Sequence, residues 1–213
     1  MNIQNIKQEQ TDFLRNQDIF TTTQRGVTTA SATGTLSGTK VITISRKNVK
    51  NIRSITVGAV SKVLGTDWTA DYTHSTGCVI TFGSNQTGDY IVSHDYGSDK
   101  IHPDFPRDDL TINSYPRIAV DILNVPIDAF GIGGSKFISN VAFTIVVYDD
   151  DSNDLDGYIN AIKEAYVTNA KLFYYLNFIK PTSIGPTINS PDKRNEIMQK
   201  NIDFLGMFEV DSA

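Results

Sequence analysis

Cysteine is almost absent from this chain of 213 residues, because Cys78 is the only one. No intrachain disulfide can therefore form, and nothing indicates an oxidising compartment. Long apolar runs are also missing: the longest, from Val141 to Tyr148, is far shorter than the roughly 20 residues that a membrane helix needs. The segment from Met1 to Gln10 is polar and lacks the apolar core of a secretory signal. We therefore expect a soluble protein that folds in a cytoplasm.

Positive charge is scarce. The chain carries 19 Lys and Arg residues against 24 Asp and Glu residues, a net charge of -5. This balance disfavours binding to duplex DNA or RNA, which depends on clustered basic side chains. The densest basic stretch, from Arg46 to Arg53, is interpreted as a solvated face. With 39% hydrophobic residues the chain is predicted to fold, as one sizeable domain or as two small ones.

The first residues predict a short helix followed by a linker. Residues 2–16 place Ile3, Ile6, Phe13 and Leu14 in a rough apolar stripe. The segment from Thr21 to Gly38 is rich in Thr, Ser and Gly and is predicted to be a linker with a first turn.

The segment from Lys40 to Gly97 predicts an all-β module. Large apolar residues alternate with other residues in two runs that begin at Cys78 and Tyr90, and a period of two places each set on one face of a sheet. The expected strands recur at the spacing of a small sandwich: Val41–Ser45, Ser54–Val63, Trp68–Thr73, Cys78–Phe82 and Asp89–Tyr96.

From Lys100 onward the pattern changes to α+β. The nearly continuous apolar run Phe137–Tyr148 predicts a central strand covered on both faces. Asp154 is predicted to cap a helix whose apolar residues, from Leu155 to Tyr166, recur at helical spacing. Further strands are expected at Arg117–Leu123, around Lys171–Ile179, around Arg194–Gln199 and at Ile202–Val210.

No segment carries a recognisable catalytic or ligand-binding motif. The acidic run from Asp149 to Asp156 lacks the glycine and closing glutamate of a calcium loop and is interpreted as a solvated loop and helix start. The glycines from Gly131 to Gly134 do not open a helix, so they predict a hairpin connection rather than a phosphate cradle. His74, His94 and His102 lack ligand-like spacing. We therefore expect no enzyme activity, no cofactor and no metal.

Two segments carry a resemblance to viral structural proteins. The pattern of short strands and glycine turns from Asp71 to Tyr96 resembles small β-sandwich modules on structural proteins of tailed phages and tailed archaeal viruses. The motif Phe-Pro-Arg-x-Asp at residues 105–109, followed by Tyr-Pro-Arg-Ile-x-Val at residues 115–120, resembles the entry to the domain of phage tail-terminator and neck proteins. Its prolines stiffen an extended lead into a strand.

The resemblance implies an α+β fold: a tail-terminator-like sheet with one main packing helix, and a small all-β, immunoglobulin-like sandwich inserted after an N-terminal helix. It implies three parts. Residues 1–25 are a helix docking on the C-terminal domain, residues 26–98 are the sandwich module, and residues 99–213 are the assembly domain. The inserted module departs from simple terminators, which leaves the position in the neck open.

The function implied is that of a virion protein forming a hexameric ring that terminates the tail tube and joins it to the head connector. Its partners are further copies of itself, the tail tube protein and neck or connector proteins. Viral DNA passes through the lumen without specific binding, and no membrane is involved. Alternatives are a head-completion or baseplate protein, or a carbohydrate-binding adhesin whose sugar platform would use Trp68, Tyr72, Tyr90 and Tyr96.

Contacts between neighbouring copies are expected at two kinds of position. Arg107 and Arg117 are predicted to make ion pairs or hydrogen bonds, within the chain or to a neighbouring subunit. Each follows a proline that fixes the backbone, so little entropy is lost when its guanidinium group is held. The segments Pro126–Lys136 and Lys180–Lys193 are predicted to be long loops that act as arms. The interface residues expected within these segments are Pro126, Gly131, Gly133, Gly134, Pro181 and Pro186.

Overall fold

The protein is a mixed α+β chain, as its sequence predicts, and it contains two β-sheets. A computed structural model describes residues 3–72, 77–104, 115–125, 127–130, 136–170, 173–190 and 197–211. The chain divides into two compact units, Met1–Ile19 with Lys100–Ala213, and Phe20–Asp99.

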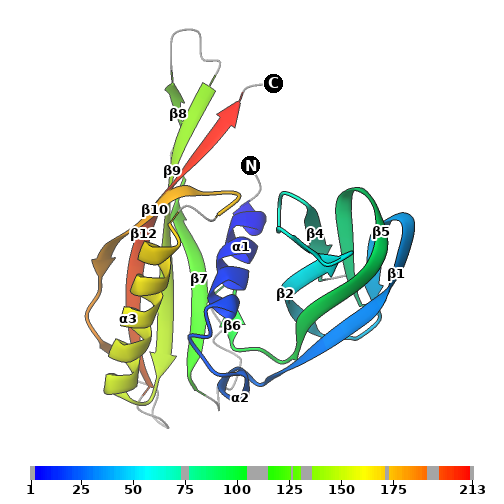
Figure 1. Cartoon of the computed structure of the whole chain (residues 1–213). Coiled ribbons are helices and arrows are strands. Elements are labelled where there is room, and N and C mark those ends of the chain that lie inside the picture. Colours follow the sequence, from blue (N-terminus) through cyan, green and yellow to red (C-terminus); the bar gives the residue numbers. More distant parts are fainter. Residues whose placement is uncertain are drawn as a thin grey trace. The chain divides into compact units, whose positions relative to one another are not determined.

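The unit Phe20–Asp99 is built on one sheet with strand order β1-β5-β2-β3, and β4 pairs with β5 (Figure 1). Its elements are α2 (Thr22–Arg25), β1 (Val27–Ile44), β2 (Val49–Val57), β3 (Val60–Lys62), β4 (Trp68–Asp71) and β5 (Cys78–Gly97). Strands β2 and β3 form a hairpin through Gly58 and Ala59, which both have positive φ, as a tight primed turn requires.

Strands β1 and β5 are long, and they pair in two stretches. The first stretch of β1 pairs with the end of β5, from Val27 opposite Gly97, and the last pairs with its beginning, up to Ile44 opposite Cys78. The register shifts around Thr39, next to Gly38 with φ +67°. Side chains from both stretches enter one core, so the sheet folds over a shared apolar centre.

The predicted linker Thr21–Gly38 is therefore wrong, because it forms α2 and the first half of β1. Its threonines are β-branched and suit a strand, but its small residues give no pattern of large apolar side chains.

The other unit contains α1 (Ile3–Asn16), β6 (Ile101–His102), β7 (Arg117–Asn124), β8 (Ile127–Phe130), β9 (Lys136–Asp149), α3 (Ser152–Thr168), β10 (Asn177–Ile184), β11 (Ile188–Ser190) and β12 (Ile197–Asp211). The strand order is β10-β12-β9-β7-β6, with β11 on β12 and β8 on β9. In Figure 1, β8 and the paired ends of β9 and β12 extend beyond helix α3.

Helix α3 covers one face of this sheet. Its residues Leu155, Ile159, Ile162 and Tyr166 are buried, at the spacing expected of an amphipathic helix. The ring of Tyr166 lies 4.4 Å from that of Phe204 on β12. The N-cap is Asp151, not Asp154 as predicted, and it accepts a hydrogen bond from the Asn153 amide.

Helix α1 is held in the same unit by polar contacts as well as packing. Glu9 accepts hydrogen bonds from the backbone amides of Tyr174 and Tyr175, and the Tyr166 hydroxyl donates to Gln10 Oε1 over 3.0 Å. Burial raises the pKa of Glu9 to about 7, although the two amide hydrogen bonds oppose this.

Candidate assembly surface

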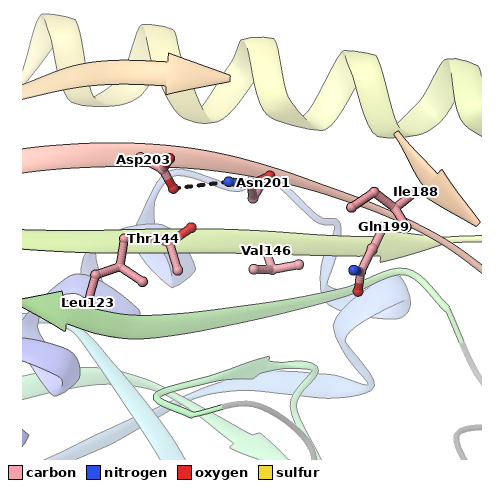
Figure 2. A pocket seen from close by; sticks show the side chains of 7 residues that line it. All are labelled: Leu123, Thr144, Val146, Ile188, Gln199, Asn201 and Asp203. Carbon is pink, nitrogen blue, oxygen red and sulfur yellow. Dashed lines mark hydrogen bonds between the residues drawn. The ribbon is translucent and has the colours of Figure 1, made fainter. Parts of the chain in front are cut away.

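The unit formed by Met1–Ile19 and Lys100–Ala213 is the larger of the two. Its sheet has a second face, opposite the residues that pack on α3. Because side chains alternate along a strand, Phe143 and Ile145 share the helix side while Thr144 and Val146 point the other way. On this second face lies a hollow of about 340 Å³, shown in Figure 2. It is lined by Leu123, Thr144, Val146, Ile188, Gln199, Asn201 and Asp203. Thr144 and Val146 on this face are nevertheless buried, with 5% and 7% of their surface exposed. Both faces of β9 are therefore buried at its centre, as the sequence predicts, and α3 covers one of them.

A polar network lies at one end of the hollow, on Asp203 of β12. Its carboxylate accepts hydrogen bonds from Ser183 Oγ at 2.6 Å and from Asn201 Nδ2 at 3.0 Å. Partial burial pushes the pKa of Asp203 upward, but these donors and the dipole of the Thr144 hydroxyl outweigh it and hold that pKa below its usual range. Asp203 is therefore ionised at neutral pH and fixed in direction.

Two further groups lie beside Asp203. The Thr144 hydroxyl is buried, has no hydrogen bond of regular geometry among the described residues, and acts on Asp203 through its dipole. The Asn201 carboxamide lies against Gly185, where an added Cβ would come within 2.0 Å of its oxygen. The hollow thus has a preformed polar end.

Exposed apolar side chains lie at both ends of the hollow, with Leu123 near Thr144 and Asp203 and Ile188 near Gln199 (Figure 2). Leu123 is 57% exposed and Ile188 is 48% exposed. Ile184, at the end of β10, and Met207 on β12 are also exposed. An apolar surface with a fixed carboxylate beside it suits contact with another protein surface better than chemistry on a small molecule.

Of the interface residues expected from sequence, Arg117 lies away from this hollow. It begins β7, is half-buried and is paired in register with Tyr148. Burial lowers the pKa of the nearby Lys100, and the charge of Arg117 adds to that effect while Asp149 opposes it. Arg117 is thus part of an intrachain charge cluster.

The predicted loop Lys180–Lys193 is wrong over most of its length, because it contains the end of β10 and all of β11. Pro181 is half-buried within β10, opposite Phe204, and Pro186 is exposed in the connection to β11. Proline is tolerated in β10 because this is an edge strand of the main sheet path. The segment Pro126–Lys136 also contains a strand, β8. Outside the described residues lie Arg107, Pro126, Gly131, Gly133 and Gly134.

The acidic run is not simply a solvated loop. Asp149 is only 4% exposed, and burial, together with the neighbouring Asp150, raises its pKa to about 6. Within the described part of the chain, no cluster of His, Cys, Asp and Glu side chains could hold a metal ion.

The four aromatic residues considered for a sugar platform do not share one open surface. Trp68 is 4% exposed within the core of the Phe20–Asp99 unit, and Tyr72 and Tyr90 pack against that core. Tyr96 lies under the guanidinium of Arg46, which is 4.1 Å from its ring centroid.

Sequence reasoning missed the residues that line the hollow. Thr144 was visible as the one polar residue inside an apolar run, and Gln199, Asn201 and Asp203 alternate at a period of two. These signals come from strands far apart in the chain, so only their pairing in register brings them together.

Comparison with protein-family models gives no match for this chain, and comparison with curated proteins gives none either. Among the described residues, no helix is both long and apolar enough to span a membrane.

Proposed function

We propose that this chain is a structural virion protein of the tail or neck, whose copies form a hexameric ring that terminates the tail tube and joins it to the head connector. The larger unit would be a tail-terminator-like assembly domain, and the Phe20–Asp99 unit an immunoglobulin-like sandwich attached to it. The ring would be a head-to-tail, cyclic assembly. It would act in the virion, after synthesis in the host cytoplasm.

The observation that carries this proposal is the path of the chain after the Tyr-Pro-Arg-Ile motif. The motif leads into β7, and after the short strand β8 come the long strand β9 ending in acidic residues, then α3, then β10 to β12. Apart from β8, this is the order of elements that the resemblance to tail-terminator and neck proteins implies. Head completion or a place in the baseplate would use the same domain in a different position of the particle.

The surface of the larger unit supports assembly in two ways. The hollow presents exposed Leu123 near the fixed carboxylate of Asp203 and exposed Ile188 at its far end, near Gln199. The paired ends of β9 and β12 reach beyond the part of the sheet covered by α3 (Figure 1), as an arm toward a neighbouring copy would. The net charge of -5 suits a lumen through which DNA slides without sticking.

The test is the mass of the purified full-length protein in solution, alone and with the tail tube protein of the same virus, combined with imaging of any ring by electron microscopy. We expect a closed multimer or a cap on the tube. The double variant in which Leu123 and Ile188 are both replaced by aspartate should not assemble, because its new charges would be buried in an apolar contact.

The matched control replaces Val60 and Val63 with aspartate. These are 59% and 60% exposed apolar residues of the other unit, and this variant should assemble normally. The proposal would be overturned if the protein stayed monomeric at every concentration and did not bind the tail tube protein. If the two double variants assembled equally well, the hollow would not be part of the contact between copies.

A further inference from the structure

A second hollow lies in the Phe20–Asp99 unit, between the two halves of strand β1. One wall is Ser31–Thr33, the other is Thr43–Arg46, and Tyr90 and His94 of β5 also line it. Its volume is about 460 Å³, within the range of sites for small molecules. It exists because β1 turns near Gly38 and its two halves pair with opposite ends of β5.

His94 is a buried polar group in this hollow with an unused hydrogen-bonding atom. It is 2% exposed, and its Nδ1 lies 3.4 Å from the Val92 carbonyl oxygen. A carbonyl can only accept, so this contact assigns the proton to Nδ1 and leaves Nε2 as an acceptor. Nε2 is buried and has no partner among the described residues.

The imidazole is neutral at physiological pH. Burial lowers the pKa of His94, and the positive charge of Arg46 adds to this, while the contact with Val92 and the charge of Asp95 oppose it. A buried acceptor without a partner costs stability, so a ligand group that donated a hydrogen bond to Nε2 would stabilise the unit.

Arg46 supplies positive charge at the wall of the same hollow. Its guanidinium is stacked over the Tyr96 ring at 4.1 Å, which restricts its motion, and it has no ion pair within the described part of the chain. A guanidinium held in this way is suited to a carboxylate, which it can bind through two parallel hydrogen bonds.

Four exposed residues that line the hollow carry hydroxyl groups: Ser31, Thr33, Thr43 and Ser45. Each hydroxyl both donates and accepts, as the hydroxyls of a sugar require. The ring of Tyr90 is held against the backbone of Gly34, where an added Cβ would lie 2.8 Å from the ring. This fixes one side of the hollow.

We propose that this hollow binds an acidic sugar, with its carboxylate on Arg46 and one of its hydroxyls donating to His94 Nε2. This inference is independent of the ring proposed above, since it concerns the other unit. It gives the Phe20–Asp99 unit a role in recognising uronic-acid-type saccharides.

The experiment is calorimetric titration of the full-length protein with D-glucuronate, D-glucose and acetate, with the imidazole signals followed by NMR. We expect saturable binding of glucuronate that shifts the His94 signal, and binding of glucose and acetate that is at least about tenfold weaker, because each lacks one charge-assisted or hydroxyl contact.

The matched pair of variants is Arg46→Gln and Lys47→Gln, which remove one positive charge from adjacent exposed positions. Arg46→Gln should weaken glucuronate binding about tenfold or more, whereas Lys47→Gln, which does not line the hollow, should change it less than about twofold. Absence of saturable glucuronate binding, equal binding of glucose or acetate, or equal effects of the two variants would each overturn the proposal.

Discussion

Replacing Arg25 with methionine should strongly destabilise the Phe20–Asp99 unit. Arg25 is fully buried, and its Nη1 and Nη2 lie 2.9 Å from carboxylate oxygens of Asp95 and Asp99 respectively. The other oxygen of Asp95 accepts from Arg53 Nε at 2.8 Å and from Thr29 Oγ1 at 2.7 Å. The cluster joins α2 and the start of β1 to the end of β5.

The size of the loss in free energy of unfolding depends on the groups that Arg25 contacts in the folded unit. Methionine fills similar volume, so a cavity contributes little. Losing the guanidinium, however, leaves two buried carboxylates, Asp95 and Asp99, facing each other with less positive charge. Breaking a buried ion pair from one side costs about 3–5 kcal/mol, a large part of the 5–15 kcal/mol that stabilises a typical domain.

The assay can be made specific to this unit. Trp68 is the only tryptophan in the sequence and is 4% exposed in the core of the Phe20–Asp99 unit. Its fluorescence during urea unfolding therefore reports this unit, even where the two units unfold separately and a single free energy for the chain is undefined.

Two further variants test whether the lost ion pairs of Arg25 cause the destabilisation. Lys47→Met, at an exposed position of the same unit, should change the free energy of unfolding by less than about 0.5 kcal/mol. Adding Asp99→Asn to Arg25→Met should recover part of the loss, because one buried carboxylate that has lost its guanidinium contact is removed. A cost for Arg25→Met within about 1 kcal/mol of the control, or strict additivity in the double variant, would refute the account.

The pH dependence gives an independent check. Burial alone would raise the pKa of Asp95, but hydrogen bonds from Arg53 and Thr29 and the charge of Arg25 lower it below the usual 3.8. A lowered pKa stabilises the folded state above the unfolded value and loses that contribution as pH falls. The wild-type unit should therefore weaken below about pH 4, and the difference from Arg25→Met should shrink there.

Three further outcomes are expected. The larger unit should lose stability as pH rises from about 4.5 to about 7, because the pKa of Glu9 is raised from 4.5 to about 7 and the folded state therefore favours its protonated form. Glu9→Gln should flatten this dependence, measured by circular dichroism. The thiol of Cys78 is fully buried and should react with a thiol reagent only after the unit unfolds. The urea concentration at which labelling is half complete should therefore equal the unfolding midpoint reported by Trp68 fluorescence. A chain in which residues 20–99 are replaced by a short flexible linker should still fold, because these residues form a separate compact unit; circular dichroism and cooperative unfolding check this.

Each of these has its own control. Glu164→Gln, at an exposed position of α3, should leave the pH profile unchanged, and an identical effect of both glutamine variants would contradict the role of Glu9. Rapid labelling of Cys78 in native buffer would show that its core opens without unfolding. For the shortened chain, a broad, non-cooperative transition would mean that the two units share stability. The contact of Arg15 Nη2 with the Ile101 carbonyl oxygen, at 2.9 Å, places the two cut ends close enough for a short linker.

Elements with large, periodic apolar residues were predictable from the sequence. Helix α1 was expected at residues 2–16 and spans Ile3–Asn16, and β7 and β9 follow their predicted runs within a residue or two. The start of α3 was misplaced because several aspartates in succession could all cap a helix. The choice of Asp151 depends on β9 ending at Asp149, which local sequence does not specify.

The C-terminal strands show a different limit. Segments around Arg194–Gln199 and at Ile202–Val210 were expected as separate strands, but they form one strand, β12. The prolines and glycines of Lys180–Lys193 indicated a loop, whereas an edge strand can accept Pro181 because its missing amide need not face a partner. Pairing with β9 over its whole length keeps β12 continuous, and that pairing is long-range information.

The small residues of strand β1 misled the fold prediction, and the same residues leave room for the hollow that Tyr90 and His94 line. Opposite His94, Val92 and Tyr90 of β5 it places Ala30, Ala32 and Gly34 in register, so each large side chain meets a small one. Small residues do not produce the alternation of large apolar side chains that indicates a strand, and the segment was therefore predicted to be a linker. The same smallness lets Tyr90 lie on the backbone at Gly34 and leaves room for the hollow that His94 lines. A strand of bulkier residues would have been easier to predict, but its side chains would have filled the space that a ligand needs.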